Sequence, residues 1–63
     1  MTVYDLEAIE NYNGLKVTDY WRLEGTSFAD ACLTAQINEL DLAHENNREP
    51  TIYDEFRQVK KND

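Results

Sequence analysis

The sequence has almost none of the cysteines and soft metal ligands that cross-link many small domains. Its 63 residues include one cysteine, Cys32, so an intramolecular disulfide is excluded and a reducing compartment is favoured. The only other soft metal ligand is His44, which on one helix would lie about 18 Å from Cys32, too far to share an ion. We therefore expect no structural metal, and we expect self-association to supply the missing stability.

Long apolar runs, glycine and positive charge are also scarce. No apolar run approaches the roughly 20 residues of a membrane span, and the N-terminus lacks the basic-then-apolar order of a signal peptide, so we expect a cytoplasmic protein without a membrane partner. Two glycines leave no glycine-rich phosphate loop, and we expect no cofactor. Thirteen acids against six bases give a net charge of -7, which disfavours direct nucleic-acid binding.

Groups that could carry catalysis are present but badly placed. Cys32 and His44 cannot meet to activate a nucleophile, and neighbouring acids such as Asp54 and Glu55 point apart on a helix. So short a chain can hardly enclose a substrate-sized pocket. The sequence predicts no catalytic residues and a protein that is not an enzyme.

Three start signals predict an all-α fold. Each is a Ser or Thr followed three residues later by Asp, as at a capped helix N-terminus: Thr2 with Asp5, Ser27 with Asp30, and Thr51 with Asp54. We expect a single domain, 1–63, with helices at about 3–13, 27–47 and 52–59 in a small self-associating bundle and a frayed tail at 60–63.

The first helix has a competitor in a hairpin turn at Asn13 and Gly14. That turn would set Glu10 opposite Val17 and Ala8 opposite Asp19, which mixes polar and apolar faces. Gly14 can instead end a helix whose apolar side is Val3, Leu6, Ile9 and Tyr12. We therefore favour the helix. The third helix would bury Ile52, Phe56 and Val59.

The segment 15–24 is ambiguous. Apolar residues alternate with polar ones as in a strand, but Asp19 interrupts the pattern, and a lone strand would leave its backbone groups unpaired. We favour a short helix or irregular turn. An α+β fold with a short strand within 15–24, or a small intermolecular sheet, stays open as the alternative.

Aromatic and small residues mark the expected interaction surface. Tyrosine and tryptophan are typical interface anchors, and alanines permit close helix approach. On the central helix, Leu33, Ile37, Leu40 and His44 form one row, so one side can face the core and another a second copy. The candidate interaction residues are Tyr20, Trp21, Phe28, Ala31, Ala35, Leu42 and Tyr53. We expect a homodimer along helix 27–47.

Charge is distributed unevenly along the chain. Between Leu23 and Asn47 there are five acids and no Lys or Arg. This stretch motivates a second hypothesis, in which the protein mimics DNA and inhibits a nucleic-acid-binding enzyme of the cell in which it acts. Helical spacing spreads these acids around the axis, so mimicry ranks second.

Three segments carry a resemblance to a known group: MTVYDL at 1–6, YWRLEG at 20–25 and SFADAC at 27–32. The chain resembles the small early proteins encoded between the exonuclease and excisionase genes of lambdoid bacteriophages, along its whole length. The resemblance implies an accessory role in the cytoplasm of an infected bacterium. That role would alter host physiology or the choice between lytic and lysogenic growth by binding a host or phage protein.

Overall fold

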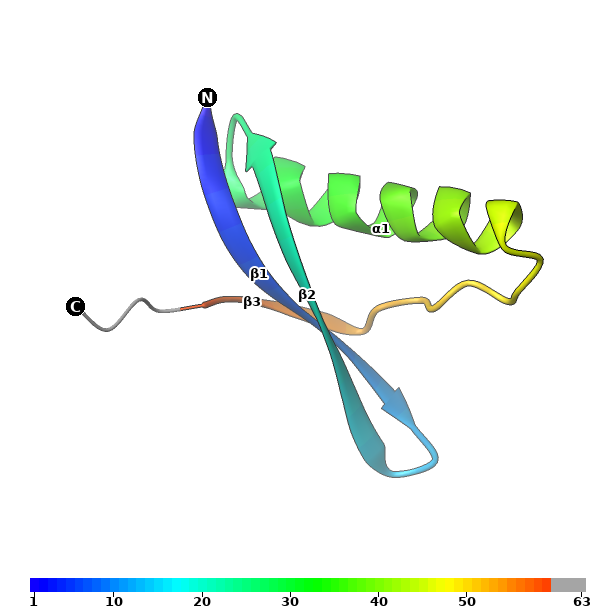
Figure 1. Ribbon diagram of the computed structural model, residues 1–63. Helices are drawn as coiled ribbons and strands as arrows, with labels where there is room; N and C mark the ends of the chain where they lie inside the picture. The colour runs from blue at the N-terminus through cyan, green and yellow to red at the C-terminus, as the bar shows by residue number, and fades with distance from the viewer. Residues whose placement is uncertain (60–63) are drawn as a thin grey trace.

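Three antiparallel strands and one helix make up the fold of this chain, seen in a computed structural model that describes residues 1–59. The elements are β1 (Thr2–Tyr12), β2 (Leu15–Gly25), α1 (Phe28–Glu45) and β3 (Glu55–Gln58), with the sheet ordered β2-β1-β3 (Figure 1). The expected all-α bundle is therefore wrong. Of its three helices only 27–47 is present, as α1, and the tail 60–63 lies outside the described residues.

The predicted helix 3–13 is instead the first strand of a long hairpin. Asn13 and Gly14 have φ angles of 52° and 81°, and two consecutive positive φ angles are the mark of a type I′ turn, whose twist matches that of paired strands. From this turn the pairing runs without interruption from Tyr12 opposite Leu15 to Thr2 opposite Gly25. The alternative strand within 15–24 is thus present as β2, and its partner is β1 of the same chain.

The two cross-strand pairs that mix polar and apolar residues, and for which the hairpin was rejected, do occur in the structure. The surroundings of each pair accommodate it. Ala8 lies opposite Asp19, but the Asp19 carboxylate accepts a hydrogen bond from the Tyr53 hydroxyl at 2.8 Å. Glu10 lies opposite Val17 near the turn, where Val17 is 47% exposed, so no buried face is mixed there. Figure 1 shows that this end of the hairpin extends away from α1.

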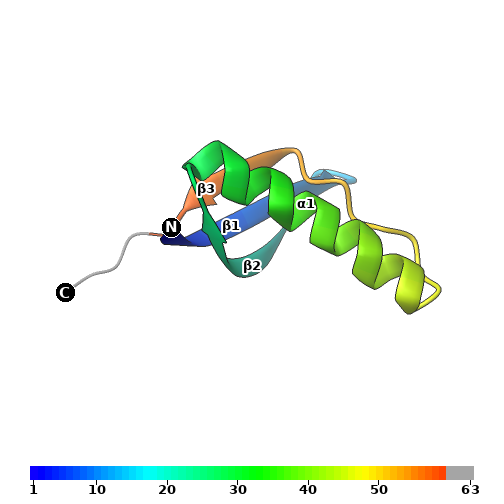
Figure 2. The ribbon, with the colours of Figure 1, turned by 90° about the horizontal axis from the view of Figure 1, so that it is seen from above.

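Alternate residues of β1 form the core beneath α1. Leu6 is fully buried and packs with Ala31 and Ala35 of the helix, which are also fully buried. Figure 2 looks down on α1 crossing over the strands, a close approach that the small alanine side chains permit. Half-buried side chains complete the cluster: Tyr4, Trp21, Leu23, Phe28, Cys32 and Phe56.

Both ends of α1 are fixed by local hydrogen bonds. The Ser27 hydroxyl accepts from the Asp30 N–H at 3.1 Å, and the Asp30 carboxylate accepts from the Thr26 N–H at 3.0 Å. At the other end Asn47 has a φ of 51°, and the Arg48 N–H donates to the Ala43 carbonyl at 3.0 Å. This closure is a Schellman motif, with asparagine in the left-handed position.

The predicted helix 52–59 is also wrong, because this segment pairs with the second edge of β1. Strand β3 sets Phe56 opposite Ala8, and two flanking backbone hydrogen bonds of 2.8 Å, from Asp54 to Ile9 and from Val59 to Asp5, lengthen the contact. An isolated helix of two turns is marginal in water. Adding a third strand instead provides backbone partners on the second edge of β1 between Asp5 and Ile9.

Candidate interaction surfaces

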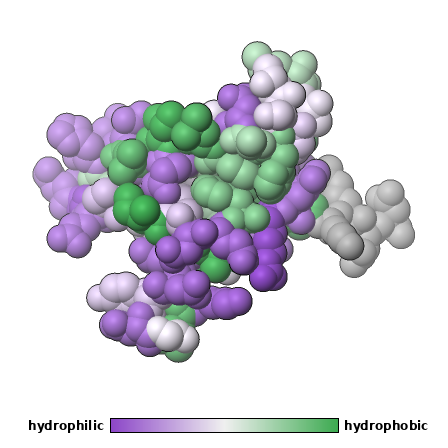
Figure 3. Space-filling model, turned by 180° about the vertical axis from the view of Figure 1, so that it is seen from behind, coloured by the Kyte–Doolittle hydropathy of each residue, from purple (hydrophilic) through white to green (hydrophobic). Residues whose placement is uncertain are grey.

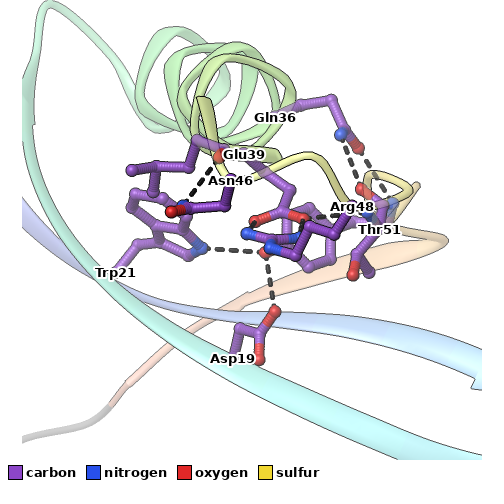
Figure 4. A network of polar contacts seen from close by, with 9 residues as sticks. Asp19, Trp21, Gln36, Glu39, Asn46, Arg48 and Thr51 are labelled. Carbon is purple, nitrogen blue, oxygen red and sulfur yellow. Dashed lines mark hydrogen bonds and ion pairs between the residues drawn. The ribbon is translucent and has the colours of Figure 1, made fainter. Parts of the chain in front are cut away.

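A polar network ties the connection between α1 and β3 to the rest of the fold. Figure 4 shows Trp21 and Asp19 of β2 on one side of it and Gln36 and Glu39 of α1 on the other. The Trp21 Nε1–H donates to the Tyr53 hydroxyl at 3.0 Å, and that hydroxyl donates to Asp19. Burial raises the pKa of Tyr53 well above its ordinary value, so the hydroxyl keeps its proton and acts as a donor.

Glu39 is the acidic centre of the second half of this network. Its carboxylate is paired with Arg48 and also accepts from the Thr51 N–H at 2.9 Å. The hydrogen bond from Arg48 is the main reason that the pKa of Glu39 falls from 4.5 to about 2, against the opposing effect of burial. Gln36 adds two bonds to the backbone, one with Thr51 and one with Tyr53.

The buried polar groups of this network are all hydrogen-bonded. Among residues 1–59, every buried side-chain nitrogen and oxygen has a hydrogen-bond partner. Sequence reasoning overlooked Glu39 as a buried anchor, although a signal was available. Ala31, Ala35, Glu39 and Ala43 recur every four residues and form the buried row of α1, so an acid at that spacing requires a partner.

A shallow pocket of about 260 Å³ lies where β1 and β2 meet the residue after β3. It is lined by Asp5, Leu6, Tyr20, Trp21, Arg22 and Val59. Its charged groups bind each other, with Arg22 Nε 2.9 Å from the Asp5 carboxylate. Within residues 1–59, no three His, Cys, Asp or Glu side chains group closely enough to hold a metal ion.

The outer side of α1 carries exposed apolar residues. Leu33, Ile37 and Leu40, here called the α1 apolar stripe, are 62%, 48% and 41% exposed. At 3.6 residues per turn they lie roughly 150° around the helix from the buried row. Figure 3, from behind, shows hydrophobic residues reaching the surface among hydrophilic ones. A helix with apolar residues on both sides has a second face available for a partner.

The predicted interaction residues divide between core and surface. Ala31 and Ala35 are buried against the chain's own sheet, and Tyr53 is buried in the polar network. Trp21 and Phe28 are half-buried around the core cluster. Tyr20 and Leu42 are exposed, on β2 and α1 respectively. The structure thus brings five of the seven into its own interior or its margin and leaves two at the surface.

Comparisons with protein-family models, with curated proteins and with solved structures found no match for this chain. Within its described part, no helix is long and apolar enough to cross a membrane.

Proposed function

We propose that this chain is a non-enzymatic accessory protein that acts by binding another protein through the α1 apolar stripe. The observation that carries the proposal is the exposure of Leu33, Ile37 and Leu40 on the side of α1 that faces away from the sheet. Residues at i, i+4 and i+7 are the anchors by which an amphipathic helix enters a groove of a partner. The partner is therefore expected to present an apolar groove.

Charge beside the stripe defines that partner further. Asp41 and Glu45 are exposed on α1 and lie on one flank of the stripe by helical spacing. The chain as a whole carries a net charge of -7. A groove with basic residues along one rim would complement this face and accelerate association at low salt.

The setting of this interaction follows from the sequence resemblance. A small early phage protein would meet its partner, a host or phage protein, in the cytoplasm of the infected bacterium. Binding would then alter host physiology or the choice between lytic and lysogenic growth.

The alternative, DNA mimicry, receives less support from the placement of the acids. Glu39 is buried and neutralised by Arg48, and Asp30 is engaged at the start of α1. Glu24 lies on β2, away from the helical acids Asp41 and Glu45. A mimic needs a continuous row of free carboxylates, which these positions do not provide.

The test is capture of partners from bacterial lysate by the immobilised protein, with the stripe intact or altered. The Leu33→Gln/Ile37→Gln double variant removes two exposed anchors without touching the core. Ile52→Gln is the matched control, since Ile52 is also more than half exposed but lies outside α1. A protein that binds the parent and the control and loses at least tenfold in affinity for the double variant would support the proposal.

A second measurement tests the expected charge of the partner. Affinity of the captured protein should fall as salt rises, because the acidic flank of α1 is solvent-exposed and is screened. Equal binding of the parent and the double variant would contradict the proposal. Competition of duplex DNA for the captured protein, unaffected by the double variant, would favour mimicry instead.

A further inference from the structure

The long strand β2 has an open edge. In the sheet order β2-β1-β3 it is an outer strand, and among residues 1–59 no strand lies on its other side. All eleven of its residues pair with β1 without a bulge, and none is proline. Edge strands are usually protected by shortness, proline, bulges, a covering element or charged side chains, and of these β2 has only the last, at Lys16, Asp19, Arg22 and Glu24. An open edge of this length is a template for another strand.

The hairpin turn determines which backbone groups point to that edge. In a two-residue hairpin the residues flanking the turn, here Tyr12 and Leu15, exchange both hydrogen bonds, and the pairs then alternate. The odd-numbered residues of β2 therefore direct their N–H and C=O groups to β1. The even-numbered residues direct theirs to the open edge: Lys16, Thr18, Tyr20, Arg22 and Glu24.

We infer that a second copy of this chain pairs with β2 in the antiparallel direction, centred on Tyr20. In that register Lys16 of each copy lies opposite Glu24 of the other, so opposite charges meet at both ends of the contact. Thr18 lies opposite Arg22, which leaves the ion pair of Arg22 with Asp5 undisturbed. The outward-pointing groups of the two strands also face each other, as an antiparallel ladder requires.

The two neighbouring registers of the β2–β2 pairing place charged residues less favourably. A pairing centred on Asp19 sets Lys16 opposite Arg22 at both ends, and like charges directly opposite destabilise a sheet. A pairing centred on Trp21 moves Lys16 beyond the strand and sets Glu24 opposite Thr18, so both opposite-charge pairs are lost. Charge therefore favours the Tyr20 register, and a second copy fits it because its own Glu24 and Lys16 supply the complementary charge at both ends.

Apolar exposure agrees with the same register. Val17, 47% exposed, would lie beside the half-buried Leu23 of the second copy on the helix-bearing face. Tyr20, 72% exposed, would lie beside its own counterpart on the opposite face. The pairing would therefore cover exposed apolar side chains of the hairpin on both faces of the sheet.

The assembly would be a six-stranded antiparallel sheet ordered β3-β1-β2-β2-β1-β3. Its two-fold axis would stand perpendicular to the sheet at Tyr20, so both α1 helices would lie on the same face. Self-association would therefore use the β2 edge, whereas the buried Ala31 and Ala35 serve the intramolecular core. The inference does not depend on the proposed function, although it would present two α1 apolar stripes side by side.

Sedimentation equilibrium of the full chain from micromolar to millimolar concentration tests the pairing. Lys16→Glu and Glu24→Lys each place like charges opposite one another at both ends, so each should weaken the dimer roughly tenfold. The double variant, Lys16→Glu with Glu24→Lys, restores opposite charges and should recover most of the affinity. Circular dichroism is the check that each variant keeps the fold, which is expected because Lys16 and Glu24 are both exposed.

A crosslinking measurement fixes the centre of the register. In a Cys32→Ala background, Tyr20→Cys would place two thiols on the two-fold axis, with Cα atoms about 5.5 Å apart, within reach of a disulfide. Lys16→Cys, far from its own counterpart, is the control and should stay reduced. The inference would be overturned if the chain is a monomer at every concentration, or if the single variants keep the parent's affinity. It would also be overturned if the double variant shows no recovery, or if Tyr20→Cys and Lys16→Cys crosslink equally.

Discussion

The Arg48 guanidinium donates two hydrogen bonds to the Glu39 carboxylate, Nη1–Oε2 at 2.6 Å and Nη2–Oε1 at 3.0 Å. Glu39 is the one charged side chain on the buried row of α1, and its pair with Arg48 fixes the chain where it leaves the helix toward β3. The third strand is thus positioned by a charge pair beside the hydrophobic core.

Replacing Glu39 with Gln should destabilise the fold by about 2 kcal/mol, because charge-assisted hydrogen bonds are lost near a buried site. The Arg48 side chain is 44% exposed and can rehydrate, which keeps the loss below that of a fully buried pair. Urea denaturation followed by circular dichroism measures the change. The control is Glu45→Gln on the exposed side of α1, expected within about 0.5 kcal/mol of the parent. Equal stability of the two variants would show that the pair contributes nothing.

Acid should weaken the fold through the same carboxylate. The pKa of Glu39 is about 2 in the folded chain against an ordinary 4.5, so its stabilising effect is complete above pH 4.5 and is lost as pH falls toward 2. The loss is at most about 3 kcal/mol for this group. Thermal unfolding across this range should show a steeper decline for the parent than for Glu39→Gln. Parallel curves would assign the acid sensitivity to other carboxylates.

Tyr53→Phe should cost about 1 to 2 kcal/mol, because it leaves the Trp21 Nε1–H without its acceptor and Asp19 without its donor. The ring remains, so its edge-to-face contact with Phe56, at 5.4 Å between centroids, is kept. Tyrosine 12 provides the control, since Tyr12→Phe alters an exposed side chain near the hairpin turn and should be neutral. Chemical denaturation of the two variants side by side makes the comparison. A Tyr53→Phe variant as stable as the parent would show that the hydrogen bonds of the Tyr53 hydroxyl with Trp21 and Asp19 do not stabilise the fold.

Only part of this fold could be predicted from the sequence. Elements stabilised by contacts between neighbouring residues were predictable, and those that depend on contacts distant in sequence were not. The start of α1 was predictable because Ser27 and Asp30 form their capping bonds within one turn. The same signal at Thr2 and Thr51 was misleading. Thr2 lies in β1 opposite Gly25, and the Thr51 N–H is bound by Glu39, a contact twelve residues away in sequence.

The hairpin illustrates the opposite case, in which a local signal was present and was overruled. Asn13 and Gly14 are the strongest short-range hairpin pair. The objection from mixed faces assumed that every pair in the hairpin is buried on one side. Asp19 is satisfied by Tyr53, 34 residues away, and Val17 lies where the hairpin is exposed, neither of which the residues near the turn could reveal.

Substitution of the two glycines by Ala and by Asn should lower the stability of the fold in opposite order: Ala is the more damaging at Gly14 and Asn at Gly25. Gly14 has a φ of 81° and open space around its missing side chain, so Gly14→Ala should cost about 1 kcal/mol through backbone strain alone, and Gly14→Asn should cost less because asparagine tolerates the left-handed region.

Gly25 is limited by space instead. A Cβ there would lie 3.1 Å from the Ala31 nitrogen, the Asp30 carboxylate and the Ser27 carbonyl oxygen, at the start of α1. The larger Gly25→Asn should therefore be more damaging than Gly25→Ala, the reverse of the order at Gly14. Thermal unfolding of the four variants compares both orders in one experiment. The same order at both positions would mean that side-chain size or backbone strain alone governs both sites, and the distinction between a turn glycine and a packing glycine would fail.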